Sequence, residues 1–164
     1  MMNYLNFFSS MIYDVAYAKI KGSRIYPSIK GLVIFYQTDD GVLVYVNVEG
    51  LPNYKSDPNN VSPIGPHGFH IHEFGNCSED ADSFMTAGGH YNPTNQPHGN
   101  HAGDFPVLFS NDGKAFMVFY TNKFKVRDII GKSVIIHENP DDYRSQPAGN
   151  SGKRIACGVI KKFI

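Results

Sequence analysis

The strongest constraint on the fold is a strict alternation of side chains in residues 42–49, VLVYVNVE. Every second residue is valine, and successive side chains of a β-strand point to opposite faces, so this stretch predicts a strand with one buried face. The preceding residues 29–37 are rich in β-branched and aromatic side chains. Because residues 38–41, TDDG, are typical of a turn, the two segments predict a β-hairpin.

Short segments of the same character recur along the chain and predict an all-β domain. They are residues 15–21, 68–72, 115–121, 133–137 and 155–160. Many short strands separated by turn residues favour an antiparallel barrel or sandwich. No helical period is evident, so we expect helix only in short turns.

Two long stretches lack any strand pattern, namely residues 75–104 and 138–153. Irregular segments of this length in a compact domain are usually functional, so we expect two functional loops. A chain of 164 residues suits one domain. We therefore predict a single domain over residues 15–164, preceded by an N-terminal tail, residues 1–14, for which tail, extra strand and interface all remain open.

The overall charge is balanced, with 15 basic and 15 acidic residues. This balance predicts neither a nucleic-acid partner nor a membrane partner, and no segment has the length of an apolar membrane span. The N-terminal stretch shows no charged start, long apolar run or small-residue cleavage site typical of a secretory signal. We therefore expect a cytoplasmic location by default. A reducing compartment disfavours disulfides, so the residue pattern alone favours buried thiols for Cys77 and Cys157.

Histidines are concentrated in one part of the chain. The seven are His67, His70, His72, His90, His98, His101 and His137, and six of them lie between residues 67 and 101. The segment GGHYNPTNQPHGNHAGD brings His90, His98, His101 and Asp104 into one loop. Three imidazoles and one carboxylate form a ligand set that zinc accepts, so the loop predicts a zinc site.

A second set of imidazoles is expected on the strands. His70 and His72 are two residues apart and therefore share one face of a strand, and His137 ends another predicted strand. An all-imidazole set suits copper as well as zinc, but a fourth nitrogen is missing. A loop histidine that binds through both ring nitrogens would complete both sites, and the residue types leave open which one does so.

Five ordered motifs resemble those of copper/zinc superoxide dismutases, particularly the bacterial type. They are HGFHIHEFGNC, AGGHYNPTNQPHG, HAGDFPVL, IIHENPDD and GNSGKRIACGVI, and the resemblance covers roughly residues 15–160. It implies an all-β, immunoglobulin-like Greek-key β-barrel or sandwich of about eight antiparallel strands with two long functional loops. The short spacing between His98 and His101 and the short second loop are bacterial-like features.

The resemblance also implies a ligand set for one copper and one zinc ion per subunit. The copper ligands would be His70, His72, His90 and His137, and the zinc ligands would be His90, His98, His101 and Asp104. His90 would bridge the two ions through an imidazolate ring. Asp141 would accept hydrogen bonds from His70 and His98, which fixes the orientation of ligand rings.

Other roles follow from the same resemblance. Arg154 would orient the superoxide anion beside the copper, and His67 would be structural rather than a ligand. Cys77 and Cys157 would form a disulfide, which replaces the thiol expectation. The resemblance assigns no steering charges, because the second loop is shorter than in the eukaryotic enzymes. Lys55, Lys123, Arg144 and Lys153 are candidates for steering the substrate by charge only, against the simpler interpretation of solvated surface residues.

The implied activity is antioxidant defence by superoxide dismutation. Two superoxide anions and two protons would give oxygen and hydrogen peroxide through cycling of copper, with His90 releasing the reduced copper, taking up a proton and returning it. A homodimer is a possible assembly. Bacterial relatives are mostly periplasmic or extracellular, in contrast to the default location above. Two alternatives stay open: a non-enzymatic module that stores or delivers metal, and a structural domain that holds zinc alone.

Overall fold

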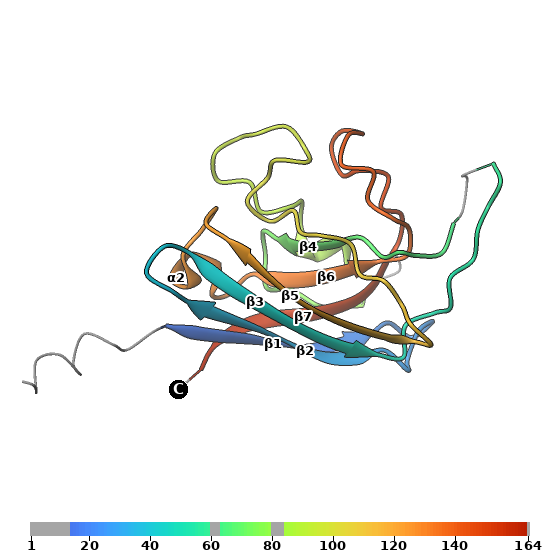
Figure 1. Cartoon of the computed structure of the whole chain (residues 1–164), viewed down its shortest axis with the longest axis horizontal. Helices are drawn as coiled ribbons and strands as arrows, with labels where there is room; N and C mark the ends of the chain where they lie inside the picture. The colour runs from blue at the N-terminus through green and yellow to red at the C-terminus, as the bar shows by residue number, and fades with distance from the viewer. Residues whose placement is uncertain (1–13, 60–62, 80–83, 164) are drawn as a thin grey trace, which may run out of the picture.

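The computed structural model describes residues 14–59, 63–79 and 84–163, which form one curled antiparallel sheet (Figure 1). Its strands are β1 (Val15–Gly22), β2 (Lys30–Gln37), β3 (Val42–Glu49), β4 (Phe69–His72), β5 (Lys114–Thr121), β6 (Ser133–His137) and β7 (Arg154–Lys162). The spatial order is β4-β6-β7-β1-β2-β3-β5. The chain therefore crosses from β3 to the far edge as β4 and returns as β5 beside β3.

The alternation in β3 has the predicted effect. Val42, Val44, Val46 and Val48 are all completely buried, and they belong to the main core that fills the inside of the curled sheet. The hairpin is also confirmed, because β2 and β3 pair in register and the amide of Thr38 donates to the carbonyl of Gly41 at 2.7 Å. Burial of one face per strand holds the sheet together, since apolar area removed from water is the main favourable term.

The prediction of an all-β antiparallel fold with little helix is confirmed. The helical elements are the four-residue α2 (Val126–Ile129) and the three-residue 3₁₀ turn η1 (Met85–Ala87). Seven strands form in the described residues rather than about eight. The segment before β5 makes only isolated bridges, His67 with Leu108 and Asn111 with Lys114. None of the helices in the described ranges is long and apolar enough to span a membrane.

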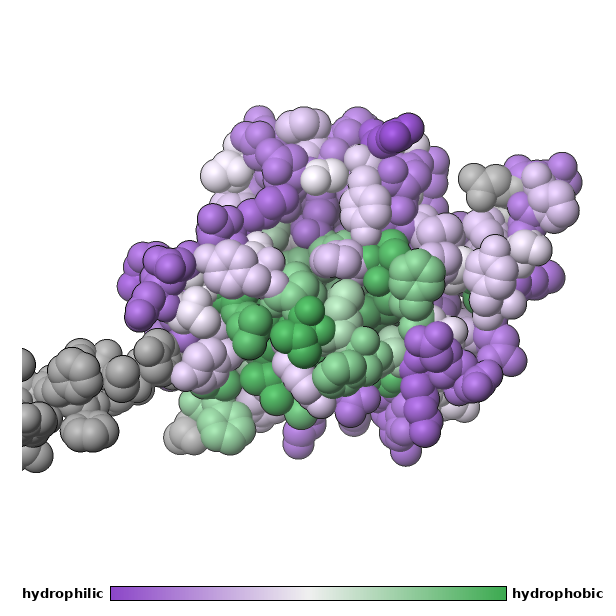
Figure 2. Space-filling model, in the orientation of Figure 1, coloured by the Kyte–Doolittle hydropathy of each residue, from purple (hydrophilic) through white to green (hydrophobic). Residues whose placement is uncertain are grey.

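Two irregular segments lie on one side of the sheet (Figure 1). We call the described part of residues 75–104 the first loop and residues 138–153 the second loop. They lie against each other, because the amide of His98 donates to Gln146 Oε1 at 2.8 Å. The predicted tail, residues 1–14, falls outside the described residues except for Asp14. The outer side of β1, β2, β3 and β5 that faces the viewer in Figure 1 presents a broad hydrophobic area (Figure 2).

Candidate metal centre

The sheet brings three of the predicted histidines together. His70 and His72 lie on β4, and each has at most 1% of its surface exposed to solvent. β4 pairs with β6, whose last residue is His137. The Nε2 atoms of His72 and His137 are 3.3 Å apart. Strand pairing thus collects side chains that are 65 residues apart in the sequence.

His90 reaches the same cluster from the first loop. The loop is held to β4 by the bridge between His72 and His90, and by the amide of Tyr91 donating to the carbonyl of Ile71 at 2.7 Å. The rings of His70 and His90 are stacked, with centroids 3.9 Å apart. Ligand atoms of the four buried residues His70, His72, His90 and His137 all lie within 4.8 Å of one another. We call this set the four-histidine group.

The other nitrogen of His90 belongs to a second cluster. His90 Nδ1 is 2.9 Å from Asp104 Oδ1, His101 Nδ1 is 3.3 Å from the same oxygen, and His98 Nδ1 is 3.3 Å from Asp104 Oδ2. These four residues, with ligand atoms within 4.8 Å of one another, form the loop group. His90 is therefore common to both groups, which is the position that a histidine binding through both ring nitrogens would need.

The donor atoms fit metal ions. Among the described residues, four buried ring nitrogens of the two groups have no hydrogen-bond partner: His70 Nδ1, His90 Nε2, His98 Nδ1 and His101 Nδ1. A buried polar atom without a partner costs free energy, and a bound cation removes that cost. The four-histidine group offers only nitrogen, which suits copper, and the loop group offers nitrogen with one carboxylate, which suits zinc.

Asp141 of the second loop connects the two groups. Its side chain is fully buried, with Oδ2 2.6 Å from His70 Nε2 and Oδ1 2.9 Å from His98 Nε2. Oδ1 also accepts the amide of Tyr143 at 2.7 Å. Because each imidazole is held through Nε2, its Nδ1 is left to face the metal group. The structure thus places Asp141 between the two histidines named from the motif.

Burial keeps the imidazoles neutral. It lowers the pKa of His70 and His72 well below the usual value, with neighbouring histidines adding to the effect, and it lowers the pKa of His137 to about 3. Burial alone would raise the pKa of Asp104, but the hydrogen bond from His90 and the nearby histidines lower it well below its usual range. Neutral imidazoles and a charged carboxylate are the forms that bind metals.

Arg154 begins β7 and pairs with His137, where the register between β6 and β7 shifts after Ile136. Its guanidinium donates from Nη1 to the carbonyl of Phe84 and from Nη2 to the carbonyl of Gly88, both at 2.7 Å. The Gly88 carbonyl also accepts from His72 Nδ1 at 3.0 Å. One backbone oxygen therefore positions both the arginine and a member of the four-histidine group. Sequence reasoning missed these carbonyls, because any residue type supplies one.

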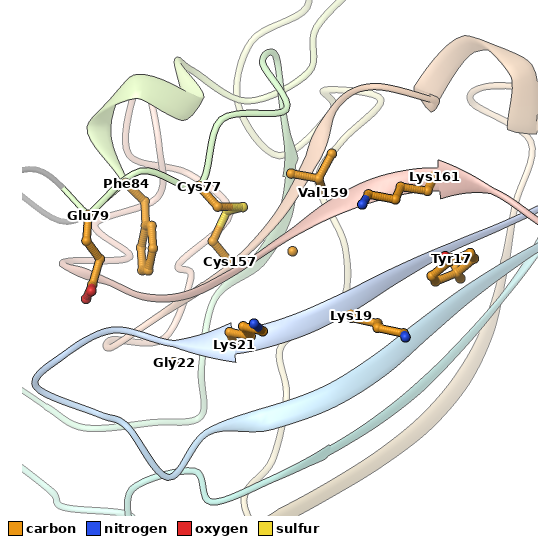
Figure 3. A pocket seen from close by; sticks show the side chains of 11 residues that line it. Tyr17, Lys19, Lys21, Gly22, Cys77, Glu79, Phe84, Cys157, Val159 and Lys161 are labelled. Atoms are coloured by element: carbon orange, nitrogen blue, oxygen red, sulfur yellow. A yellow bond between two sulfur atoms is a disulfide. The ribbon is translucent and has the colours of Figure 1, made fainter.

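The predicted disulfide between Cys77 and Cys157 is confirmed, and the earlier expectation of buried thiols is wrong. The two Cα atoms are 5.6 Å apart although 80 residues separate them, because the first loop crosses β7 at this point. Figure 3 shows the disulfide beside a hollow of about 540 Å³ that Lys19, Lys21 and Lys161 also line. The bond ties the first loop to the strand that carries Arg154.

The remaining candidates occupy different places. His67 is buried, with Nδ1 2.9 Å from the carbonyl of His137, and it belongs to neither metal group. Among the proposed steering residues, Lys123 donates from Nζ to the carbonyl of His101 at 3.2 Å and so reaches the loop group. Lys55, Arg144 and Lys153 are exposed.

Two residues that sequence reasoning missed tie the second loop to the first loop and to the residues that follow it. Gln146 accepts the amide of His98, and the Tyr143 hydroxyl accepts the amide of Val107 at 2.8 Å and donates to the carbonyl of Phe105 at 3.1 Å. The only feature of the sequence that could have indicated them is their position in the second loop, between Asp141-Asp142 and Gly149.

Comparison with known proteins identifies the family. Residues 29–160 match the family described as copper/zinc superoxide dismutase. The chain is 40% identical to a superoxide dismutase [Cu-Zn] of Legionella pneumophila over 163 residues, covering 94% of this chain and 92% of that protein. It is 39% identical to superoxide dismutase [Cu-Zn] 2 of Aquifex aeolicus over 140 residues, covering 76% and 75%.

A third relative, the superoxide dismutase-like protein YojM of Bacillus subtilis, is 39% identical over 127 residues, covering 68% of this chain and 63% of that protein. The family match covers most of the described sheet and both metal groups. With two buried histidine groups that share one ring on an antiparallel β fold, this chain belongs to the copper/zinc superoxide dismutase family.

Proposed function

We propose that this chain catalyses superoxide dismutation with one copper and one zinc ion per subunit. Copper would be held by the four-histidine group, and zinc by the loop group. The observation that carries the proposal is His90, whose Nδ1 faces Asp104 while its Nε2 is buried without a hydrogen-bond partner among the described residues. A ring with its two nitrogens in two clusters suits a bridge between two ions.

The reaction converts two superoxide anions and two protons to oxygen and hydrogen peroxide. Copper supplies the one-electron chemistry when bound, and zinc supplies fixed positive charge and order in the first loop. Within the protein, His90 Nε2 is the atom suited to taking up a proton and returning it to the reduced dioxygen, while Nδ1 stays on the side of Asp104. Asp141 keeps the rings of His70 and His98 oriented through the cycle.

Arg154 is proposed to orient the anion. Two backbone carbonyls hold its guanidinium, and the shared Gly88 carbonyl places it next to His72. A fixed cation in a partly buried setting attracts a small anion more strongly than a mobile surface lysine does. Substrate selection by charge alone suits superoxide, which offers few other features to recognise.

The chemistry of the cysteines argues against thiol-based copper delivery. The sequence has two cysteines, and both are in the disulfide, so no thiol pair remains to pass copper to a partner. Storage through histidines stays as the competing function. It would not require Arg154 to be held beside the four-histidine group.

The test is dismutation by protein loaded with one copper and one zinc, compared with zinc-only protein. We expect fast turnover only with copper, and a loss of about tenfold or more in Arg154→Ala, because the steering cation is removed. Arg127→Ala, an exposed arginine outside both loops, is the matched control and should retain the activity. Copper binding without turnover would reject the enzymatic role in favour of metal storage.

A further inference from the structure

The hollow beside the disulfide lies between β1 and β7, and we call it the lysine hollow (Figure 3). Strand register pairs Tyr17 with Lys161 at one end of it and Lys21 with Cys157 at the other. Lys19 lies between them on the same face of β1, because alternate side chains of a strand point the same way. Its volume of about 540 Å³ is within the range of small-molecule sites. None of the described residues that line it belongs to either metal group, so it is a separate site.

Three positive charges surround the lysine hollow. Lys19, Lys21 and Lys161 are exposed, and none of them takes part in an ion pair with another described residue. The described lining contains one carboxylate, Glu79, and Arg24 already binds it. The Arg24 amide donates to Glu79 Oε1, and Arg24 Nε pairs with Oε2 at 3.3 Å. A cleft lined by charges of one sign concentrates ions of the opposite sign, so the lysine hollow is suited to an anion.

The walls between these charges are less polar. Phe84 and Val159 line the lysine hollow together with the two cysteines of the disulfide (Figure 3). Carbon surface of this kind can pack against the organic part of a ligand, while lysine ammonium groups bind phosphate as point charges. Three cations on flexible side chains can each reach a different phosphate group. The lining therefore favours a small molecule with several phosphate groups over a single small anion.

The lysine hollow adjoins the contact that positions Arg154. The Phe84 side chain lines it, and the Phe84 carbonyl accepts a hydrogen bond from Arg154 Nη1 at 2.7 Å. Cys157, at the same end of the hollow, lies on the strand that Arg154 begins. A ligand in the lysine hollow would therefore contact both the strand and the loop segment that hold the arginine.

We propose that the lysine hollow binds a small polyanion that carries phosphate groups, with Lys19, Lys21 and Lys161 as the donors. A chain of three phosphates is the shortest that gives each ammonium group a phosphate of its own. The bound anion offsets the repulsion among the three lysines. It also covers the half-buried Cys77, which is the more accessible half of the disulfide.

The test is isothermal titration calorimetry of the metal-loaded, disulfide-intact full chain with tripolyphosphate, compared with orthophosphate. We expect tripolyphosphate to bind more tightly. Its binding should weaken as the salt concentration rises from about 50 to about 200 mM, because salt screens charges at an exposed site. Lys21→Gln/Lys161→Gln should raise its dissociation constant by at least about tenfold, because two charged donors are lost.

Lys114→Gln is the matched control. Lys114 is also exposed, and it begins β5, which lies three strands from β1 and outside the lysine hollow. This variant should bind tripolyphosphate like wild type. Any contact of the probe with bound metal would be the same in all variants, so a loss confined to Lys21→Gln/Lys161→Gln reports on the hollow. Circular dichroism of each variant without the probe establishes that it is folded.

Reduction of the disulfide by dithiothreitol gives a second readout at the same place. Saturating tripolyphosphate should slow the reduction at least about threefold in wild type and not in Lys21→Gln/Lys161→Gln, because thiol–disulfide exchange depends on access to the sulfur. Equal protection in both proteins would place the anion elsewhere and overturn the proposal.

Two results of the titration would also overturn it. One is a wild type that shows no binding at about 1 mM tripolyphosphate, and the other is binding that Lys21→Gln/Lys161→Gln leaves unchanged. Binding that appears only in Asp80→Asn/Asp82→Asn would mean that carboxylates of the chain itself, outside the described residues, already neutralise the lysines, which contradicts the proposal as well. None of these measurements needs turnover, so their outcome is independent of the proposed function.

Discussion

At the scale of single residues, the metal centre depends on histidines that stay neutral. His70, His72 and His137 are buried, and burial holds the pKa of each below its usual value. A neutral imidazole has a lone pair on one nitrogen, while the other nitrogen donates a hydrogen bond, as His70 Nε2 does to Asp141. Once the metals are removed, the same burial lowers the stability of the folded protein in acid, because the buried rings resist protonation.

Metal-free protein is therefore expected to lose stability below about pH 6.5. In the unfolded chain these histidines take up protons near pH 6.5, whereas the folded protein resists protonation down to the lowered pKa, about 3 for His137. Folding stability thus falls as pH decreases through this window, by up to about 1.4 kcal/mol per pH unit for each histidine that is protonated in the unfolded chain and neutral in the folded protein. Asp104 gives no compensation, because its pKa is also lowered and it remains charged there.

Urea unfolding of the chelator-treated protein at pH 7, 6 and 5 measures this dependence. The disulfide stays intact throughout, and the metal-loaded protein is the control, since bound ions compete with protons for the same nitrogens. A free energy of unfolding that does not change between pH 7 and pH 5 would contradict the expected neutral state of the three histidines.

At the scale of elements, the second loop acts as the support of the first. Asp141 contacts His70 and His98, and Gln146 accepts the amide of His98. Gly149 allows this approach: it has φ +64°, and a Cβ there would overlap Asp141 Oδ1 and come within 2.5 Å of His98 Nε2. The loop backbone is therefore packed against the side chains that orient the ligands.

Gly149→Ala should weaken zinc and copper binding by about 10–100-fold, because the methyl group displaces Asp141 from the ligand rings. Competition titrations with a chelator measure the two affinities. Gly131→Ala is the matched control: Gly131 also has positive φ (+82°), but nothing lies within 4 Å of its Cβ position. It should lower stability by about 1–2 kcal/mol through backbone strain alone and leave metal affinity unchanged. Equal loss of affinity in both variants would rule out the steric explanation.

At the scale of the whole molecule, the disulfide joins the first loop to the sheet. It connects Cys77 to Cys157 on β7, the strand that begins with Arg154, while the carbonyls of Phe84 and Gly88 on the loop hold the guanidinium. The disulfide therefore restricts the unfolded chain. It also fixes the strand that carries Arg154 relative to the loop carbonyls that accept its hydrogen bonds. Stability and activity are coupled through this one link.

Cys77→Ser/Cys157→Ser should lower the free energy of unfolding by about 3–5 kcal/mol, given the 80-residue separation. It should also reduce turnover of the metal-loaded protein by more than it reduces zinc affinity, because Arg154 loses its fixed acceptors. Chemical unfolding and dismutation assays measure the two effects. Reduced wild type is the control and should behave like the double variant. Full activity in the folded double variant would show that the carbonyls hold Arg154 without the disulfide.

Much of the fold could be predicted because its signals are local. Alternation in residues 42–49 identified β3 and its buried face, and turn residues delimited the other strands to within one or two residues. The zinc-type loop set was evident because His90, His98, His101 and Asp104 lie within 15 positions of the sequence. Strand periodicity also placed His70 and His72 on one face, since side chains two apart in a strand are neighbours.

Contacts between distant segments required the tertiary structure. Residue pattern alone favoured thiols for Cys77 and Cys157, since nothing in their spacing shows that the first loop crosses β7. The carbonyls that hold Arg154 and the role of Gln146 likewise depend on how the two loops pack, and the pairing of Leu43 with Tyr120 depends on strand register. The sequence by itself determined the strands and the ligand types, because these follow from the chemistry of near neighbours. Tertiary packing alone decided which distant atoms meet, because that depends on how the sheet curls and pairs.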